Sequence, residues 1–377
     1  MSRLDELIAE LCPDGVEYKA LKEVYKRLKG TPITAGKMKE IDSSDGEIRV
    51  FAGGKTVINA HAEDIPKANI TRVPAVLVQS RGVIDVVYYD KPFTFKNEMW
   101  AYTHDKQVSV KYLYYVLKKN INTFREAASG MGSLPQISLK VTDDFVIPVP
   151  PLEVQREIVR ILDNFTELTA ELTAELTARK KQYEYYCHSL FENANGIKMV
   201  TLDQISENCD SQRKPVTSGN RELGDIPYYG ASGIVDYVKD YIFDGDYLLI
   251  SEDGANLLAR STPIAFSISG KTWVNNHAHV LRFDEYATRR YVEMYLNSID
   301  LSYYITGAAQ PKLNQKNLNK IEIPLPDLEE QKRIIGILDK LFDLCNSMFS
   351  GLPAEIEARQ KQYEYYRDKL LTFKQLA

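Results

Sequence analysis

ARKKQYEYY at residues 178–186 returns as ARQKQYEYY at residues 358–366, so that eight of nine positions match across an offset of 180 residues. A match of this quality between two parts of one chain indicates an internal duplication. The duplication extends upstream, where residues 148–158 correspond to residues 324–334 at an offset of 176. The same structural unit is therefore expected twice in this chain.

The duplication divides the 377 residues into two diverged heads and two helical segments. This length is about twice that of a typical single domain, which also predicts two cores. The heads are expected at residues 1–150 and 197–325, and the helical segments at residues 151–196 and 326–377. Because the helical segments kept their sequence while the heads drifted apart, the pattern indicates one repeated frame that carries two different faces.

Residues 152–191 are predicted to form one long helix, since a proline-rich entry precedes them and no glycine or proline interrupts them. Such a helix is about 60 Å long at 1.5 Å per residue. Residues 169–176 form two perfect Thr-Ala-Glu-Leu units, and residues 165–168 are a near-copy. One more unit would lengthen the helix by roughly 6 Å and keep it amphipathic, so we interpret the repeat as an adjustable spacer. The alternative is an ordinary run of good helix formers.

The second helical segment is interrupted by Ser-Gly-Leu-Pro at residues 350–353, which predicts two helices over residues 328–350 and 353–373. Long helices are stable only against a partner, so the two segments are expected to pack together. Tyrosines could stack on bases, but in a repeated helical motif they more often pack. The residues expected in this packing are Ile158, Ile161, Leu162, Phe165, Leu168, Leu172, Leu176, Tyr183, Tyr186, Ile334, Ile337, Leu338, Leu341, Tyr363 and Tyr366.

Bulk properties narrow the class of protein. The net charge of −5 argues against simple electrostatic binding to DNA. If this chain reads DNA, other subunits would have to supply much of the contact with the phosphates. The four cysteines are scattered, which predicts reduced structural thiols rather than a zinc site or disulfides. No apolar run approaches the roughly 20 residues of a membrane span, and the acidic start does not resemble a signal peptide. A cytoplasmic protein without membrane contact is expected.

Each head mixes short β-rich runs with turns. Strands are expected at residues 74–78 and 83–89 in the first head and at residues 247–250 and 264–268 in the second. A polar turn follows the first strand of each pair. If these turns meet DNA, arginine would favour guanine, glutamine or asparagine would favour adenine, and a carboxylate can accept from cytosine. The alternative is that they are ordinary solvated turns. The candidate DNA-binding residues are Gln79, Ser80, Arg81, Lys91, Lys96, Asn97, Ser251, Glu252, Asn256, Arg260, Lys271, Asn275, Asn276, Gln310 and Lys312.

Catalytic signatures are missing from the sequence. We find no phosphate-binding loop, no G-x-S-x-G elbow, no H-E-x-x-H motif and no Asn-Pro-Pro-aromatic tetrad of adenine methyltransferases. Glu17-Tyr18-Lys19 after Pro13-Asp14 imitates a nuclease pattern, but the acids are too close in sequence for the usual strand pair. His277-x-His279 has no further ligand with a matching pattern nearby in sequence, so neither catalytic residues nor a metal site is expected.

Two divergent heads, near-identical helical tails and tandem Thr-Ala-Glu-Leu units together resemble the DNA-specificity subunit of Type I restriction-modification systems. The segment 147–158 and its copy from Ile323 look like the openings of that family's conserved regions. The resemblance implies an α+β fold, in which two α/β target recognition domains are joined by two long antiparallel helices. These helices would form a coiled coil with internal pseudo-twofold symmetry.

The resemblance also implies a function. Each target recognition domain would read one half of a split, asymmetric site in double-stranded DNA, and the helices would set the gap and dock two methyltransferase subunits. Those subunits hold S-adenosylmethionine and methylate adenine, so this chain would bind no cofactor itself. Separate restriction subunits with translocase and nuclease activity complete the complex. Two alternatives stay open: a coiled-coil structural adaptor without DNA readout, and a nuclease or methyltransferase with unrecognised motifs.

Overall fold

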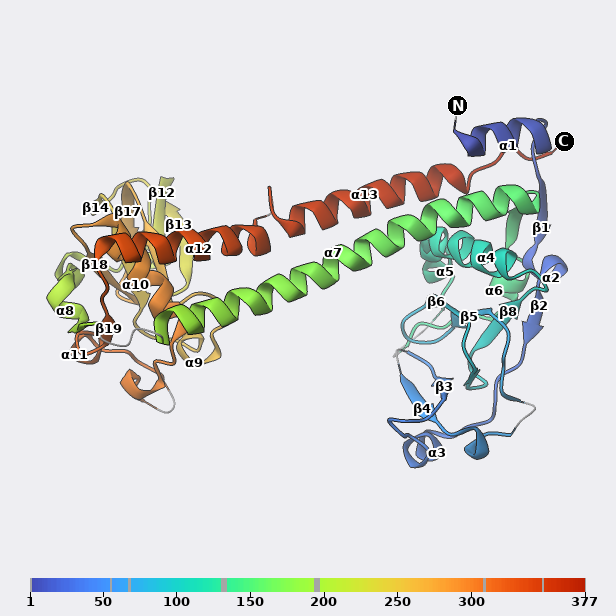
Figure 1. The fold of residues 1–377 in the computed structure, drawn as a ribbon, viewed down its shortest axis with the longest axis horizontal. Coiled ribbons are helices and arrows are strands. Elements are labelled where there is room, and N and C mark those ends of the chain that lie inside the picture. The colour runs from blue at the N-terminus through green and yellow to red at the C-terminus, as the bar shows by residue number, and fades with distance from the viewer. Residues whose placement is uncertain are drawn as a thin grey trace. The chain divides into compact units, whose positions relative to one another are not determined.

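The structure is a computed structural model that describes residues 2–54, 56–66, 69–129, 134–192, 197–307, 310–347 and 349–376. The chain divides into two compact units (Figure 1). Unit 1 contains Met1–Glu171 together with Ile356–Ala377, and unit 2 contains Leu172–Glu355. Each unit therefore combines one head with parts of both helical segments.

Unit 1 begins with α1 (Arg3–Leu11), whose first turn is closed by a capping box between Ser2 and Asp5. The strands of its head are β1 (Glu17–Ala20), β2 (Lys26–Leu28), β3 (Ile48–Phe51), β4 (Val57–Ala60), β5 (Ala75–Gln79), β6 (Asp85–Tyr89), β7 (Phe93–Phe95), β8 (Trp100–Thr103) and β9 (Val146–Val149). The helices of this head are α2 (Leu21–Val24), α3 (Ala35–Glu40), α4 (Gln107–Lys119), α5 (Ile121–Glu126) and α6 (Leu139–Asp143). The long helix α7 (Leu152–Glu192) follows directly.

Unit 2 repeats this order of elements in part. Its strands are β10 (Met199–Thr201), β11 (Glu207–Asn208), β12 (Leu223–Gly230), β13 (Gly233–Val238), β14 (Phe243–Asp244), β15 (Tyr247–Ser251), β16 (Ala265–Ile268), β17 (Lys271–Val274), β18 (Ala278–Arg282) and β19 (Glu322–Pro324). Its helices are α8 (Leu202–Ile205), α9 (Asn256–Ala259), α10 (Tyr286–Ser298), α11 (Gln315–Leu318) and α12 (Leu328–Asn346), and α13 (Leu352–Leu370) begins here and continues in unit 1.

The sheets of the two heads correspond in part. Head 1 has a four-stranded sheet in the order β2-β8-β5-β6, and head 2 has its counterpart in the order β11-β18-β15-β16. The two-stranded pairs β1-β9 and β10-β19 also match. The remaining sheets share a core as well: β4-β3-β7 in head 1 and β13-β12-β17 in head 2 each combine an antiparallel hairpin with a parallel third strand, and head 2 has β14 in addition. The duplication therefore preserves the arrangement of both sheets, and head 2 adds the edge strand β14 to the second one.

The central strands β5 and β15 are apolar up to their last residues, Gln79 and Ser251, because each packs against two cores. In β5, Val76 and Val78 belong to the core that includes α4 and α7, whereas Ala75 and Leu77 belong to a core with Phe93 of β7. Successive side chains of a strand point to opposite faces, so both faces of β5 are covered. The strands expected at residues 74–78, 83–89, 247–250 and 264–268 are present as β5, β6, β15 and β16, with ends shifted by one or two residues.

Helix α7 confirms the prediction of one uninterrupted helix over residues 152–191. The break in the second copy is also confirmed, since α12 ends at Asn346 and α13 begins at Leu352. Its position differs from the expectation. Gly351 does not cap α12, which ends four residues earlier than predicted, and Pro353 lies in the first turn of α13, where a missing N–H is tolerated.

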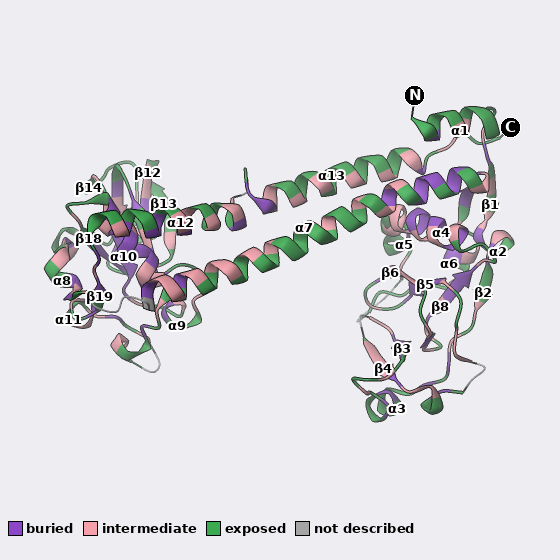
Figure 2. Ribbon diagram, viewed as in Figure 1, coloured by how far each residue is buried: buried purple, intermediate pink, exposed green. Residues whose placement is uncertain are grey.

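The first turns of the long helices pack into the heads. Ile158 and Leu162 of α7 are fully buried in the core of head 1, and Ile334 and Leu338 of α12 are buried in the core of head 2. These residues were expected in helix-to-helix packing, and their cores combine residues of the head with residues of the other helical segment, such as Leu371 in unit 1 and Phe191 in unit 2. Buried residues of α7 gather near its two ends, and the stretch between them is exposed or half-buried (Figure 2).

The helices pair within each unit. In unit 1 the ring of Phe165 in α7 stacks on Tyr366 in α13 with centroids 5.5 Å apart. In unit 2 Tyr183 of α7 contacts Phe342 of α12 at 5.9 Å. The start of α7 thus meets the end of the second helical segment and its end meets the start, which is an antiparallel arrangement. The other residues expected in this packing are half-buried, except Leu168, which is 36% exposed.

Hydrogen bonds between head and helix entry are duplicated as well. The hydroxyl of Tyr112 donates to the carbonyl of Pro148 at 3.3 Å, and Tyr291 donates to Pro324 at 2.7 Å. An ion pair joins the first head to α7, Lys111 to Asp163 at 3.1 Å, and its counterpart joins Arg290 to Asp339 at 2.6 Å. A matching bond from a glutamine side chain to a proline carbonyl closes each helix start, Gln155 to Pro150 and Gln331 to Pro326.

Among the described residues, no helix is long and apolar enough to cross a membrane.

Candidate nucleic-acid interface

The ends of β5 and β15 lead into the polar turns in which DNA contacts were expected. Several of the candidate side chains there are buried. Gln79 is 6% exposed, Ser80 is 1% exposed and Ser251 is fully buried. The hydroxyl of Ser80 donates to the carbonyl of Glu98, and that of Ser251 donates to the carbonyl of Ala231. These serines tie neighbouring turns together, so they do not offer a surface that DNA could reach.

Other candidates are engaged within the fold. Asn256 accepts hydrogen bonds from Ser261 and from the backbone N–H of Thr262, and its amide donates to the carbonyl of Thr262. Arg260 adopts a left-handed backbone with φ of 50° and donates to the carbonyl of Leu296 at 3.3 Å. Asn275 is 7% exposed and caps a turn by accepting from the N–H of His277. These side chains shape the loops of head 2.

The remaining candidates lie at the surface. Lys96 is half-buried in an ion pair with Glu98 at 3.0 Å. The exposed candidates are Arg81, Lys91 and Asn97 in head 1 and Lys271, Asn276, Gln310 and Lys312 in head 2. Their side chains are available to a ligand, and they mix cationic groups with amides. Such a set can contact phosphates and base edges.

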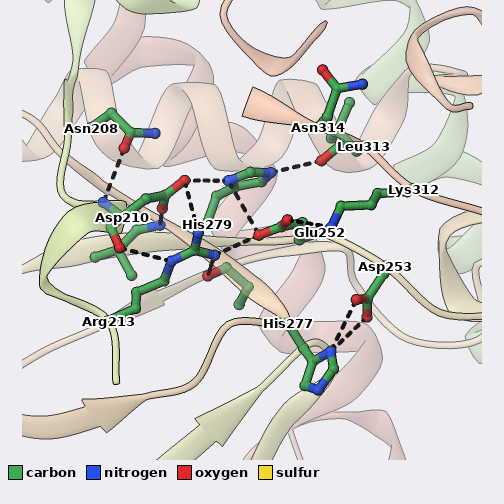
Figure 3. A network of polar contacts seen from close by, with 12 residues as sticks. Asn208, Asp210, Arg213, Glu252, Asp253, His277, His279, Lys312, Leu313 and Asn314 are labelled. Carbon is green, nitrogen blue, oxygen red and sulfur yellow. Dashed lines mark hydrogen bonds and ion pairs between the residues drawn. The ribbon is translucent and has the colours of Figure 1, made fainter. Parts of the chain in front are cut away.

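A network of charged side chains lies at the end of β15 in head 2 (Figure 3). Asp210 lies 2.6 Å from Nδ1 of His279, and Nε2 of the same ring lies 2.7 Å from the carbonyl of Leu313. Arg213 donates to Glu252 at 2.6 Å and to the carbonyl of Ala278 at 2.8 Å. Lys312 reaches Glu252 from the surface at 3.0 Å. The network thereby connects four chain segments that are distant in sequence.

Three members of this network could in principle bind a cation. Asp210, Glu252 and His279 each offer one ligand atom, and these atoms lie within 4.8 Å of one another. Their charges are already compensated, since Arg213 pairs with both carboxylates and Lys312 pairs with Glu252. A cation would have to displace two cationic side chains and the contact between His279 and Asp210. We therefore interpret the cluster as a structural charge network rather than a metal centre.

The network keeps its carboxylates ionised. Burial acts to raise the pKa of Asp210, but the hydrogen bond and charge of His279 outweigh it and leave that pKa below its usual value. Burial likewise acts to raise the pKa of Glu252, and hydrogen bonds from Arg213 and Lys312 lower it overall. The segment after β15 is therefore held by ion pairs at neutral pH.

Sequence reasoning missed Asp210 and Arg213. His279 was singled out together with His277, and no Asp, His or Cys with a matching ligand pattern lies near it in sequence. The fold supplies Asp210 from 69 residues away, because β11 pairs with β18 and brings the turn after β11 beside His279. His277 itself is exposed and lies 3.0 Å from Asp253 (Figure 3). Only the strand pairing could have indicated these contacts.

Comparisons with known proteins place this architecture in a family. The family described as "Type I restriction modification DNA specificity domain" matches the chain twice, over residues 13–179 and 195–358. The Escherichia coli "Type I restriction enzyme EcoR124I/EcoR124II specificity subunit" is 32% identical over 410 residues, which cover 99% of this chain and 97% of that protein. A Haemophilus influenzae relative, "Putative type I restriction enzyme specificity subunit S.HindORF215P", is 37% identical over 200 residues, so the match spans 52% of this chain and 51% of that protein.

Solved structures share the fold over nearly the whole chain. The crystal structure of the Type-I restriction-modification system S subunit from M. genitalium has a TM-score of 0.62 at 18% identity and covers 95% of this chain and 96% of that chain. A chain from a study of complex assembly and conformational transition of the type I R-M system has a TM-score of 0.56 at 17% identity, with 96% and 98% covered. The double family match and the full-length relative together show that this chain belongs to the specificity subunits of type I restriction-modification systems, which are non-catalytic.

Proposed function

We propose that each head of this specificity subunit reads one half of a bipartite, asymmetric site in double-stranded DNA. The observation that supports this proposal is that both heads pack on their helices in the same way, with matching hydrogen bonds such as Tyr112 to Pro148 and Tyr291 to Pro324. The exposed polar residues of the two heads, in contrast, differ. Two equivalent frames with unlike faces suit a site whose halves are unlike. We take residues 1–150 and 197–325 as the two target recognition domains.

The helices are proposed to set the distance between the half-sites. The Thr-Ala-Glu-Leu units lie within the continuous helix α7, and no residue from 166 to 178 is buried. A unit added there would advance the helix by roughly 6 Å and rotate it by about 40°, without disturbing the core of either head. Helices with a half-covered apolar stripe suit this role, because their length can change while their packing register is largely kept.

The helical frame is also proposed to dock two methyltransferase subunits. Tyr185 and Tyr365 occupy matching positions in the repeated motif, and they are 66% and 62% exposed. Each ring contacts the next tyrosine along its helix, Tyr186 at 5.7 Å or Tyr366 at 5.3 Å, and still leaves most of its surface exposed. Exposed aromatic side chains at two equivalent positions suit docking of the same partner twice. S-adenosylmethionine would be held by those partners and not by this chain, and restriction subunits with translocase activity would join the same complex.

The test of DNA reading is methylation mapping. The chain is co-expressed with the methyltransferase subunit of its own system, and methylated adenines are mapped across the host genome. We expect one bipartite motif with two different half-sites. An intact complex that methylates without a bipartite motif, or not at all, would contradict the proposal and favour a structural adaptor.

The spacer and docking roles have separate tests. Inserting one Thr-Ala-Glu-Leu unit after Leu176 should widen the gap and leave both half-sites unchanged, and deleting residues 173–176 should narrow it. Altered half-sites at a constant gap would refute the spacer role. The double variant Tyr185→Ala and Tyr365→Ala should weaken co-purification of the methyltransferase subunit, whereas Tyr303→Ala, which removes a 91% exposed tyrosine from head 2, should not. Equal recovery with all variants would exclude docking through these tyrosines.

A further inference from the structure

The two heads share one backbone arrangement at the end of the central strand. In head 1, the N–H of Ile137 donates to the carbonyl of Ser80 at 3.0 Å, and Arg81 forms an isolated β-bridge with Gln136. In head 2, the N–H of Leu313 donates to the carbonyl of Glu252 at 2.8 Å, and Asp253 forms the same bridge with Lys312. We call this arrangement the strand-end clamp, formed by residues 80–82 with 136–137 and by residues 252–254 with 312–313.

The bridge partner in each clamp is held from its other side as well. Gln136 and Ser129 exchange backbone hydrogen bonds of 3.1 and 3.0 Å, and Lys312 and Thr306 exchange bonds of 2.8 and 2.9 Å. Both clamps therefore fix three backbone segments in the same order. This agreement is notable because the sequences of the heads have diverged, and it means that equivalent positions can be compared directly.

Burial follows the same register in both clamps. Ser80 is 1% exposed and Glu252 is 8% exposed, whereas the next residue, Arg81 or Asp253, has its side chain at the surface or half-exposed. A glycine with positive φ comes next, Gly82 at 77° and Gly254 at 100°. This left-handed conformation is accessible to glycine at little cost, so the turn that presents the preceding side chain is a built feature of each head.

The side chains presented by the clamps are chemically unlike. Partners in an antiparallel bridge project to the same face, so Arg81 lies beside Gln136 and Asp253 lies beside Lys312. Head 1 thus offers hydrogen-bond donors and an amide, which suit guanine and adenine. Head 2 offers the carboxylate of Asp253, which can accept from cytosine, next to Lys312, whose ammonium group contacts Glu252 at 3.0 Å. The same scaffold position therefore carries opposite recognition chemistry in the two heads.

The charge network gives the clamp of head 2 a rigid support. Glu252 lies at its centre, where Arg213 holds it at 2.6 Å and Lys312 reaches it at 3.0 Å (Figure 3). Asp253 is oriented by His277, whose Nδ1 lies 3.0 Å from both carboxylate oxygens. Both presented side chains are therefore restrained before any ligand arrives, which lowers the entropy cost of recognition.

We propose that the strand-end clamps are the principal base-reading positions, Arg81 with Gln136 for one half-site and Asp253 with Lys312 for the other. This inference rests on the proposed function and sharpens it to four residues. Arg81 and Lys312 were among the residues expected from the sequence, Asp253 lies in the polar turn expected to meet DNA, and the fold adds Gln136. Gln79, Ser80, Ser251 and Glu252 act as supports rather than as readers. Phosphate contacts are left to other exposed cations and to the partner subunits.

The experiment compares methylation motifs of variants within the co-expressed complex. Arg81→Ala and Gln136→Ala should relax one half-site by about tenfold at a single base position and leave the other half-site intact. Asp253→Asn keeps the hydrogen-bond geometry toward His277 but replaces a pure acceptor by an amide, so it should shift base preference in the other half-site by a similar factor. Asp105→Ala and Asp284→Ala are the matched controls. Both heads carry an exposed aspartate at this position, just before α4 and α10, so it cannot account for a difference between the two half-sites, and neither variant should change the motif.

The outcomes separate the two levels of the proposal. A bipartite motif that keeps both half-sites in all the clamp variants would overturn the assignment of the clamps while supporting bipartite reading. Loss of both half-sites with any one variant would also overturn it, since one head would then control both. Absence of a bipartite motif in the unmodified complex would overturn the proposed function and this inference with it. The intact half-site in each variant serves as the internal control for folding and assembly.

Discussion

Replacing Leu162 by alanine should destabilise unit 1 and spare unit 2. Leu162 is fully buried among the core residues of head 1, although it lies on α7. Removing a buried leucine side chain to alanine costs about 2–5 kcal/mol, which combines the lost transfer free energy with the cavity that remains. The matched control is Leu168→Ala on the same helix, where the side chain is 36% exposed and the loss should stay at about 1 kcal/mol.

The two tryptophans allow each unit to be followed separately. Trp100 lies in unit 1 and donates to Thr142 at 2.8 Å, and Trp273 lies in unit 2 and donates to the carbonyl of Lys214 at 2.6 Å. Thermal unfolding is recorded by tryptophan fluorescence in a Trp273→Phe background for unit 1 and in a Trp100→Phe background for unit 2. A loss of about 3 kcal/mol corresponds to a midpoint lowered by roughly 6–12 °C for a unit of this size.

Two results would refute the reasoning. Equal midpoint shifts for Leu162→Ala and Leu168→Ala would mean that the apolar stripe of α7 is packed uniformly along the helix pair, as the sequence pattern suggested. A shift of the Trp273 signal as large as that of the Trp100 signal would mean that the start of α7 does not belong to unit 1 alone. The symmetry of the fold supplies a second instance, since Leu338→Ala should lower the midpoint of unit 2 instead.

Three further predictions concern the helix break, the charge network and the thiols. Gly351→Ala should lower the thermal midpoint of unit 2, because a Cβ there would lie 2.6 Å from the carbonyl oxygen of Asp343. Gly336→Ala in the open middle of α12 should instead stabilise unit 2 by about 0.5–1 kcal/mol. A higher midpoint for Gly351→Ala than for Gly336→Ala would contradict the geometry. Because the pKa of Asp210 is lowered in the fold, its ionised form stabilises unit 2 above about pH 4, and this contribution is lost as the pH falls further. Asp210→Asn should therefore make the stability of unit 2 fall less steeply with decreasing pH. An unchanged dependence on acid pH would disprove this role of Asp210. All four cysteines are free and buried, and burial raises the pKa of each thiol. Ellman's reagent should therefore react with them only after unfolding, and rapid labelling of the native chain would contradict their burial.

The sequence alone was sufficient for the repeat, the long helices and the family. Helix α7 could be predicted because its signals are local: a proline-rich entry, apolar residues at helical spacing, and no breaker over 40 residues. The interruption near Gly351 is equally local, and only its boundaries moved. A duplicated motif needs no spatial information either, because identity at a constant offset is visible along the chain itself.

Burial and partnership were decided by the tertiary structure. Periodicity shows that Ile158, Leu162 and Leu168 share one helix face, but the same face meets the head at one end and is partly exposed further along. Asp210 and His279 are separated by 69 residues and become neighbours only through the pairing of β11 with β18. The register at the strand ends likewise depends on which backbone bonds form across the clamp, so the buried Ser80 and the exposed Arg81 cannot be distinguished from their sequence position. A local pattern specifies the conformation of a segment, whereas the free energy that buries or exposes each side chain comes from segments far away in the chain.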